Sequence, residues 1–446
     1  MDQQQPKRGS SLDQEREPST PSEKGCNDLE PAPDGGTQSW LVAAGGACVF
    51  FSALGFSNSF GVFEEYYLAH QLQGETANKV AWIGSMATFL QFAIGAIGGP
   101  LFDRFGAWVR SVLSRSLVLQ KHTNIHQVIR PTAVVYVFAI MMTSLCTKYW
   151  QFMLAQGILL GVSMGFLQFP AMAAVTQYFD KKRAAALGLV TAGSSIGGVV
   201  IPIALSKMLN GTSLGFGWSV RVMVFVLIPL LGFASLTVRP RLPPRKTTFF
   251  VGAAFKDLRY DLIVAAFFFM LIAMFAPLFY IPTYAVSRGV EATLASYLLA
   301  IVNAASTFGR IIPGVLADKF GRLNVFVIGG LATGIVVFCF NEPTSTAGLV
   351  VYSIVVGFSS GTIISGCAAA LTVCIKNPQE AGAYIGMGMA VASVAALIGP
   401  PVNGALVDRY GGFSQMSIFS GVMCLAGGFI ALGAKAATPQ GVWGRV

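Results

Sequence analysis

Long apolar segments separated by short polar loops run through most of the chain. Each segment is close to the about 20 residues that a helix needs to cross a lipid bilayer. We count twelve such segments between residues 40 and 434 and expect an all-α polytopic membrane protein. The expected spans are 40–63, 80–102, 131–147, 150–175, 184–209, 218–238, 261–286, 293–316, 323–341, 347–374, 381–407 and 413–434.

Lysine and arginine are distributed unevenly over the loops between these segments. Cytosolic loops of membrane proteins carry an excess of both residues. With the amino terminus inside, nineteen of them fall in inner connections or at the carboxyl end, and five in outer connections. We therefore expect a protein of the cell membrane with both termini in the cytosol. The first 39 residues are polar and predict a disordered tail, not a cleavable signal peptide.

The segments divide into two halves of six, 40–238 and 261–434, joined by a basic cytosolic linker at 239–260 and followed by a short tail at 435–446. A similar sequence follows the second segment of each half. The two copies are Gly99-Pro-Leu-Phe-Asp103-Arg104-Phe-Gly106 and Gly314-Val-Leu-Ala-Asp318-Lys319-Phe-Gly321-Arg322. The same pattern at the same place indicates an internal repeat. We interpret both copies as gating loops that hold the inner face closed through charge pairs and helix-end contacts.

Twelve spans in two halves with this G-x-L-x-D-[RK]-x-G loop resemble the major facilitator superfamily, in which the loop is the hallmark motif. Two further segments resemble the fungal branch of the monocarboxylate-porter family: Asp34-Gly35-Gly36 with Trp40, and Tyr178 to Gly198. The resemblance covers residues 34 to 434. It implies a secondary transporter in which two six-helix halves rock about a site at the middle of the membrane.

Small residues lie along one side of the fifth segment. Such residues keep a helix thin, so that another helix can approach closely. We interpret the group as a helix-packing motif that serves either sliding or static close packing. Its glycines are Gly188, Gly193, Gly197 and Gly198.

Two arginines, Arg221 and Arg310, lie within apolar segments. An ionisable residue inside the membrane is costly and usually functional. Arg310 resembles the family's substrate-anion arginine, with Gly314 four residues on, and a guanidinium can hold a carboxylate through two parallel hydrogen bonds. Structural pairing with backbone carbonyls is the alternative for Arg310. For Arg221, near the outer surface, the alternative is snorkelling to the interface.

The sequence departs from the animal members of that family around the expected site. Those members have an aspartate one turn before the arginine and a lysine in the first span, and both serve proton-coupled carboxylate transport. Here Ser306 takes the place of the aspartate, and the first span has Asn58 instead of a lysine. Proton coupling by the usual pair is therefore not supported. Glu64 and Glu65, at the outer end of the first span, are either other proton sites or residues of an exposed rim.

Uncharged polar residues within the spans favour a larger and less charged substrate than lactate. Alternatively, each of them forms a hydrogen bond that holds two helices together. The group comprises Asn58, Gln91, Gln168, Tyr280, Tyr284 and Asn303.

Composition excludes several other functions. Charged residues make up 11% of the chain, and the net charge of +10 arises in loops between spans, which is typical of membrane topology and not of nucleic-acid binding. The seven cysteines are scattered without metal-ligand spacing, and no nucleotide motif occurs. We therefore expect no cofactor, no metal and no enzyme activity. The expected partners are a small-molecule substrate and the lipid bilayer, with an ion or solute gradient such as one of protons supplying the energy, and the chain is expected to be monomeric.

Two local features do not follow from the repeat or from the spans. Residues 109–127 have no counterpart in the second half, and their codons can begin with GT and end with AG, so we interpret them as a retained short intron. A genuine basic amphipathic loop on the inner membrane face is the alternative. Asn210-Gly211-Thr212 is a glycosylation triplet in an outer loop that is short for glycosylation.

The sequence predicts export of a carboxylate-bearing secondary metabolite. Uptake of a monocarboxylate or vitamin is one alternative, and a nutrient sensor that binds without transporting is another.

Overall fold

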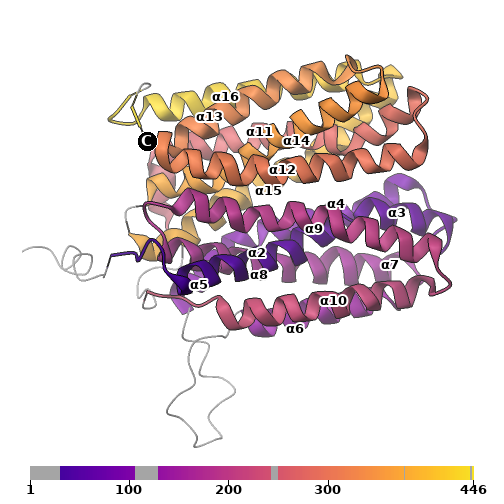
Figure 1. Ribbon diagram of the computed structural model, residues 1–446, viewed down its shortest axis with the longest axis horizontal. Coiled ribbons are helices and arrows are strands. Elements are labelled where there is room, and N and C mark those ends of the chain that lie inside the picture. The colour runs from indigo at the N-terminus through magenta and orange to yellow at the C-terminus, as the bar shows by residue number, and fades with distance from the viewer. Residues whose placement is uncertain (1–30, 106–128, 243–249, 376, 442–443, 446) are drawn as a thin grey trace, which may run out of the picture. The chain divides into compact units, whose positions relative to one another are not determined.

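A computed structural model of the chain shows a bundle of long helices lying side by side (Figure 1). The structure describes residues 31–105, 129–242, 250–375, 377–441 and 444–445. The segment 109–127, which we interpret as a retained intron, lies outside these residues, as does Gly106 of the first predicted gating loop.

The first half of the chain forms the first group of helices. They are α2 (Thr37–Ser57), α3 (Phe60–Ala69), α4 (Ala77–Ala93), α5 (Gly95–Phe105), α6 (Ile129–Thr143), α7 (Tyr149–Phe152), η1 (Met153–Leu159), α8 (Leu160–Tyr178), α9 (Arg183–Gly211) and α10 (Gly215–Thr237). Adjacent pieces such as α2 and α3 continue one another as single spans, here Thr37–Ala69.

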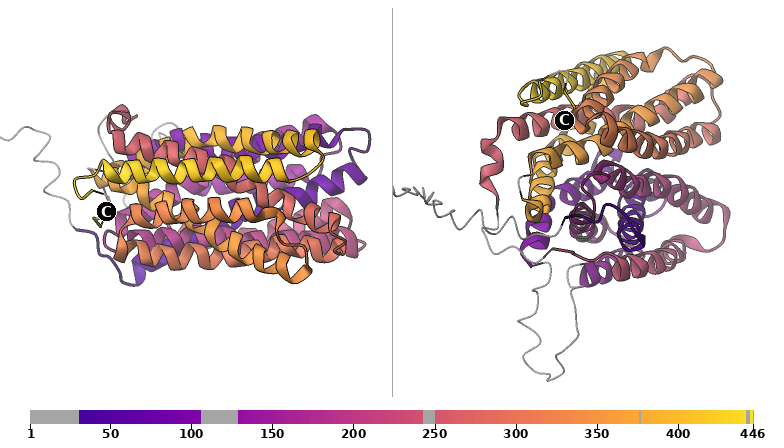
Figure 2. Two further views of the ribbon diagram at one scale, coloured as in Figure 1. Left: turned by 90° about the horizontal axis from the view of Figure 1, so that it is seen from above. Right: turned by 60° about the vertical axis from the view of Figure 1, so that its left-hand side comes forward.

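The second half repeats the arrangement. Its elements are η2 (Gly252–Lys256), α11 (Leu258–Ser287), α12 (Ala292–Phe320), α13 (Arg322–Phe338), η3 (Cys339–Asn341), α14 (Thr346–Leu371), η4 (Thr372–Cys374), η5 (Pro378–Glu380), α15 (Ala381–Tyr410) and α16 (Ser414–Ala436). In Figure 2 these orange to yellow helices pack beside the indigo to magenta helices of the first half.

Eleven of the described helical segments are long and apolar enough to cross a membrane, and Ile129–Thr143 is a shorter apolar helix. The predicted all-α, twelve-helix architecture is confirmed. The first span continues to Ala69, beyond its predicted end at residue 63, because α3 extends α2.

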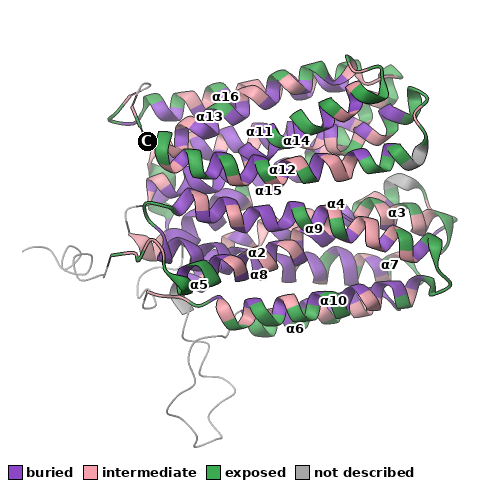
Figure 3. Cartoon of the chain, in the orientation of Figure 1, coloured by how far each residue is buried: buried purple, intermediate pink, exposed green. Residues whose placement is uncertain are grey.

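Exposed residues lie on the outside of the bundle and buried residues fill its interior (Figure 3). Many of the exposed residues have large apolar side chains. Val134 on α6, Leu236 on α10, Ile328 on α13 and Phe429 on α16 each have 60% or more of their surface exposed. Exposed apolar surface of this extent is unfavourable in water and favourable against lipid. The chain is therefore a multi-pass membrane protein.

The first and last described residues of the chain lie at the same end of the bundle, which we call the tail end. Here α8 ends at Tyr178 and α9 begins at Arg183, while α12 ends at Phe320 and α15 begins at Ala381. The tail end lies on the left in Figure 1. We call the opposite end the far end.

Glycines bring the two halves together along two seams. On the α9–α12 seam, a methyl group added to Gly188 would lie 2.5 Å from the backbone oxygen of Arg310, and one added to Gly314 would lie 2.9 Å from that of Ala184. On the α5–α15 seam, Gly99 faces the backbone of Gly382 in the same way. Side chains at these positions would hold the halves apart, so the glycines permit the contact.

The predicted packing motif on α9 serves two neighbours. Gly193 and Gly197 face the backbone of α2 within the first half, at Ala47 and Phe51. Gly188 faces α12 of the second half. The helix is thus thin on two sides.

Candidate functional site

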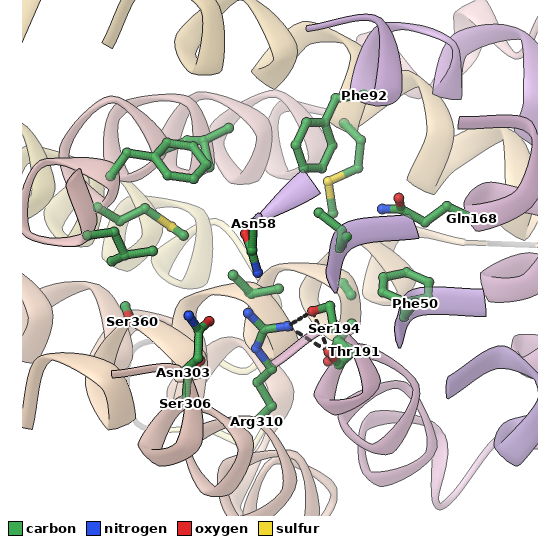
Figure 4. A pocket seen from close by; sticks show the side chains of 18 of the residues that line it. Phe50, Asn58, Phe92, Gln168, Thr191, Ser194, Asn303, Ser306, Arg310 and Ser360 are labelled. Carbon is green, nitrogen blue, oxygen red and sulfur yellow. Dashed lines mark hydrogen bonds between the residues drawn. The ribbon is translucent and has the colours of Figure 1, made fainter. Parts of the chain in front are cut away.

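A cavity of about 70 Å³ lies between the halves, in the interior of the bundle (Figure 4). Helices of both halves line it. Its polar lining consists of Asn58, Gln168, Thr191, Ser194, Asn303, Ser306, Arg310 and Ser360. Its apolar lining consists of Phe50, Leu54, Phe92, Phe169, Met172, Phe267, Leu271, Met274, Phe275, Leu278, Val302, Ile364, Ala368 and Met389.

Arg310 is the single ionisable side chain among the described residues that line this cavity. It projects from α12 with 6% of its surface exposed. Its Nη1 donates to the backbone oxygen of Thr191 at 2.6 Å and to Ser194 Oγ, both on α9 of the other half. The guanidinium therefore connects the two halves at the cavity.

The other edge of the guanidinium remains available. Within the described part of the chain, the Arg310 Nε–H is buried and has no hydrogen-bond partner. Nε and Nη2 lie on one edge of the planar group, which is the arrangement that binds a carboxylate through two parallel hydrogen bonds. A buried donor without a partner costs free energy, so an anion at this edge would be stabilised.

Two asparagines from opposite halves meet beside Gly198. Asn58 follows α2, and Asn303 lies on α12 with its Nδ2 donating to the backbone oxygen of Leu299 at 3.1 Å. A methyl group at Gly198 would lie 2.6 Å from Asn58 Nδ2 and 3.0 Å from Asn303 Oδ1. The absence of a side chain at Gly198 therefore leaves room for both amides.

Gln168 and Ser306 also line the cavity, and Gln91 contacts Gln168. Gln91 Nε2 donates to Gln168 Oε1 at 2.8 Å, and Gln91 is itself fully buried behind it. Ser306, one turn before Arg310, is 4% exposed. The structure thus brings together Arg310, Asn303, Ser306, Asn58 and Gln168, with Gln91 behind them.

Three of the predicted pathway residues lie elsewhere. Tyr284 OH donates to the backbone oxygen of Asn341 at 2.8 Å, and Tyr280 packs against the Phe413 ring, with 6.2 Å between ring centroids. Arg221 Nε donates to Ser144 Oγ at 3.2 Å. These contacts hold helices together within one half, and the residues are not among those lining the cavity.

The carboxylates of the two predicted gating loops cap helices of the opposite half. Asp103, at the end of α5, accepts hydrogen bonds from the N–H groups of Gly382 at 3.2 Å and Ala383 at 2.7 Å. Asp318, at the end of α12, accepts from Ala184 at 3.0 Å and Ala185 at 2.8 Å. The first N–H groups of a helix have no partner within it, and the helix dipole favours a negative charge there.

The remaining residues of the second loop surround this contact. Gly321, with φ of 104°, forms the turn between α12 and α13. Arg322 Nη2 donates to the backbone oxygen of Asp180 at 2.6 Å, and its Nε lies 3.7 Å from Asp318 Oδ1. Lys319 is exposed. In the first loop, Arg104 lies within α5.

Sequence reasoning anticipated the kinds of contact made by the charged groups but not the partner residues. Arg310 binds the backbone oxygen of Thr191, which is the alternative given for it above, and also Ser194. Asp103 and Asp318 bind backbone N–H groups at helix starts, which are helix-end contacts, and Asp318 also pairs with Arg322. The apolar cavity wall was missed as well, because phenylalanine and methionine inside a span look the same whether they face lipid, core or cavity. Glu64 is partly buried on α3 and is not among the cavity residues, and Asn210 is exposed near the end of α9.

A family profile and individual relatives of the chain indicate the same family. The sequence profile described as Major Facilitator Superfamily matches residues 45–340 and 289–444. The aspyridones efflux protein apdF of Emericella nidulans is 49% identical over 406 residues, which are 91% of this chain and 79% of that protein. The agnestins efflux protein AgnL12 of Paecilomyces divaricatus is 37% identical, over 89% of this chain and 87% of that protein.

Solved structures share the fold at low sequence identity. The human organic anion transporter MFSD10 superposes with a TM-score of 0.67 at 14% identity, covering 89% of this chain and 100% of that one. FucP in its outward conformation gives a TM-score of 0.64 at 17% identity, covering 89% of this chain and 99% of that one. The narrower resemblance to monocarboxylate porters stays a prediction. On the extent of the profile match and of its relatives, the chain belongs to the major facilitator superfamily.

Proposed function

We propose that this chain exports an amphipathic organic anion, a carboxylate-bearing secondary metabolite, across the cell membrane by alternating access. The observation that carries the proposal is the free edge of Arg310 in the cavity between the halves. Its buried Nε–H, beside Nη2, suits one carboxylate held by two parallel hydrogen bonds.

The rest of the lining suits the body of such a molecule. Asn58, Asn303 and Ser306 can bind hydroxyl or carbonyl groups near the acid. Aromatic and methionine side chains, among them Phe92 and Met389, offer an apolar surface that can adapt to ring systems. A single cation in a largely apolar wall favours a mostly apolar molecule with one negative charge.

The small volume of the cavity indicates that the site must widen before a substrate can bind. Ligand pockets occupy about 300–1,000 Å³, whereas this cavity has about 70 Å³. The halves must separate around it before a metabolite can enter. At the tail end the caps at Asp103 and Asp318 hold the halves together, so entry from that side requires these contacts to break.

The direction of transport rests on two further arguments. Basic residues concentrate at the tail end, and we therefore assign that end to the cytosol, with both termini there. Relatives that share most of the chain are named as efflux proteins for aspyridones, agnestins and fujikurins. Release from the cytosol to the outside is the direction that agrees with these names.

Replacement of Arg310 tests the proposal. Inside-out vesicles containing the chain are given a panel of labelled aromatic and aliphatic carboxylates, with and without a pH gradient. We expect Arg310→Ala to reduce uptake of the accepted acid about a hundredfold, since two charge-assisted hydrogen bonds are lost. Arg310→Lys should restore only part of the flux, because an ammonium cannot form the paired bonds.

Arg221→Ala is the matched control, because Arg221 is a span arginine bonded to Ser144 outside the cavity. It should transport the acid at the parent rate, and all variants should reach the membrane in equal amounts. Normal flux in Arg310→Ala would refute the anchoring role. Uptake only in right-side-out vesicles would favour an importer, and binding without flux would favour a sensor.

A further inference from the structure

The turn between α8 and α9 is held from two sides, and one of them is the segment that precedes α2. Asp34 Oδ1 accepts hydrogen bonds from three successive backbone N–H groups of this turn: Asp180 at 2.6 Å, Lys181 at 2.8 Å and Lys182 at 3.3 Å. One carboxylate oxygen thus fixes three peptide units.

Neighbouring contacts fix Asp34 itself. Its N–H donates to the backbone oxygen of Tyr178 at 3.1 Å, and the Trp40 ring packs against Phe179 with centroids 5.0 Å apart. Asp34 is also the single described residue other than glycine with a positive φ, at 50°. A left-handed conformation costs a non-glycine residue free energy, and it persists only where surrounding contacts compensate.

The opposite side of the same turn receives the second half of the molecule. The Asp180 backbone oxygen accepts from Arg322, and the next two N–H groups after Arg183, those of Ala184 and Ala185, bind Asp318. Arg183 closes the turn, with its Nε donating to the Phe179 oxygen at 2.9 Å. Asp34 and the second half therefore hold successive peptide groups of one short segment.

We propose that Asp34 is a positioning residue for closure of the tail end. It holds residues 180–182 in the conformation that presents the start of α9 to Asp318 and the Asp180 oxygen to Arg322. Without the Asp34 carboxylate, the turn keeps its covalent connections but loses three hydrogen bonds, and the receiving groups for the second half become mobile. The tail end then opens more often. This inference concerns closure, not the substrate, and it stands or falls independently of Arg310.

A distance measurement across the tail end tests it. Spin labels are placed at Leu236→Cys on α10 and Ala436→Cys on α16, both exposed at the tail end of opposite halves, with the native cysteines replaced. We expect Asp34→Gly, which loses all three hydrogen bonds, to increase the ratio of long to short distances about tenfold. Asp34→Asn keeps the Oδ1 acceptor but loses its charge, so it should increase the ratio by a smaller factor. Glycine adopts a positive φ without strain, so Asp34→Gly removes the carboxylate without burdening the backbone.

Two comparisons separate positioning from a general loss of structure. Asp408→Asn changes an exposed acid at the far end and should leave the distances unchanged. Asp34→Asn combined with Asp318→Asn should shift the ratio by less than the product of the single effects, because both act on the start of α9. Asp34→Asn combined with Asp103→Asn should give the product. Parent-like distances in both Asp34 variants would overturn the proposal, as would independent effects of Asp34 and Asp318.

Discussion

Gly198 occupies the point at which side chains from both halves approach each other. Asn58 comes from the first half and Asn303 from the second, and both amides lie within contact distance of where a side chain at residue 198 would be. Both asparagines line the same cavity as Arg310. The size of residue 198 therefore limits the room for a substrate.

A methyl group at this position should reduce transport. Gly198→Ala displaces the ends of the Asn58 and Asn303 side chains, which can move at little cost but then leave their positions at the cavity. Losing a hydrogen bond from one of these amides to the substrate costs about 0.5–1.5 kcal/mol. We expect about a tenfold loss of flux at low substrate concentration, measured in vesicles. Gly211→Ala, near the end of the same helix with no atom within 4 Å of the added carbon, should behave like the parent. Equal flux in both variants would show that residue 198 does not limit the site.

The residue-level prediction for Arg310 was only partly accessible to sequence. Its place in an apolar segment singled it out, because a cation there needs a reason. Its partners could not be inferred, since Thr191 and Ser194 are more than a hundred residues away and ordinary in type. They reach Arg310 because Gly188 lets α9 and α12 pack closely, and that distance is set in three dimensions.

At the level of helices, the tail end is closed by two equivalent caps. In each, an aspartate at the end of one helix meets the first N–H groups of a helix from the other half. Each seam carries one cap, and the N–H groups that bind Asp103 differ from those that bind Asp318. The two copies of the loop therefore have the same role, since each binds the start of a helix in the other half.

Neutralising either aspartate should loosen the tail end. A negative charge at a helix amino terminus contributes about 0.3–2 kcal/mol, so Asp103→Asn or Asp318→Asn should raise the open-to-closed ratio up to about thirtyfold. The double variant should show the sum of the two free-energy changes, because the sites are independent. Spin-label distances between Leu236→Cys and Ala436→Cys provide the measurement. No change in either single variant would contradict the role of the caps.

The sequence predicted that the two loops act together, since a repeat is visible without a structure. It did not reveal what they bind. A backbone N–H has no signature in the sequence, so the receiving positions could not be identified from it. In the neighbouring basic cluster at Lys181 to Arg183, Arg183 contributes to the turn by binding Phe179 and Asp180, while Lys181 and Lys182 are exposed.

For the molecule as a whole, hydropathy predicted the number of spans correctly because lipid contact demands apolar segments of a fixed length. Hydropathy did not predict which helices of the two halves pack against each other. Seams built from Gly188, Gly314, Gly99 and Gly382 depend on which faces of four helices meet, and small residues are frequent throughout the spans.

The orientation that we assign can be checked on intact cells. An impermeant lysine reagent should modify Lys148, which is exposed at the far end, and should spare Lys181 and Lys319, which are exposed at the tail end. After the cells are opened, all three should react. This expectation follows from the concentration of basic residues at the tail end, a distribution that favours the cytosolic side of a membrane. Modification of Lys181 in intact cells would reverse the assignment.

The caps at Asp103 and Asp318 bind peptide groups, and this has a consequence for how such carriers can diversify. Any residue has an N–H except proline, so the receiving positions 184, 185, 382 and 383 are restricted in size by the close seams but not in chemical identity. Each half supplies one aspartate and receives the other, so at these two contacts a substitution in one half needs no matching side chain in the other, provided that the seam glycines are kept. Halves taken from different carriers of this family could close on each other, which would let new cavities form by recombination while the closing contact stays intact.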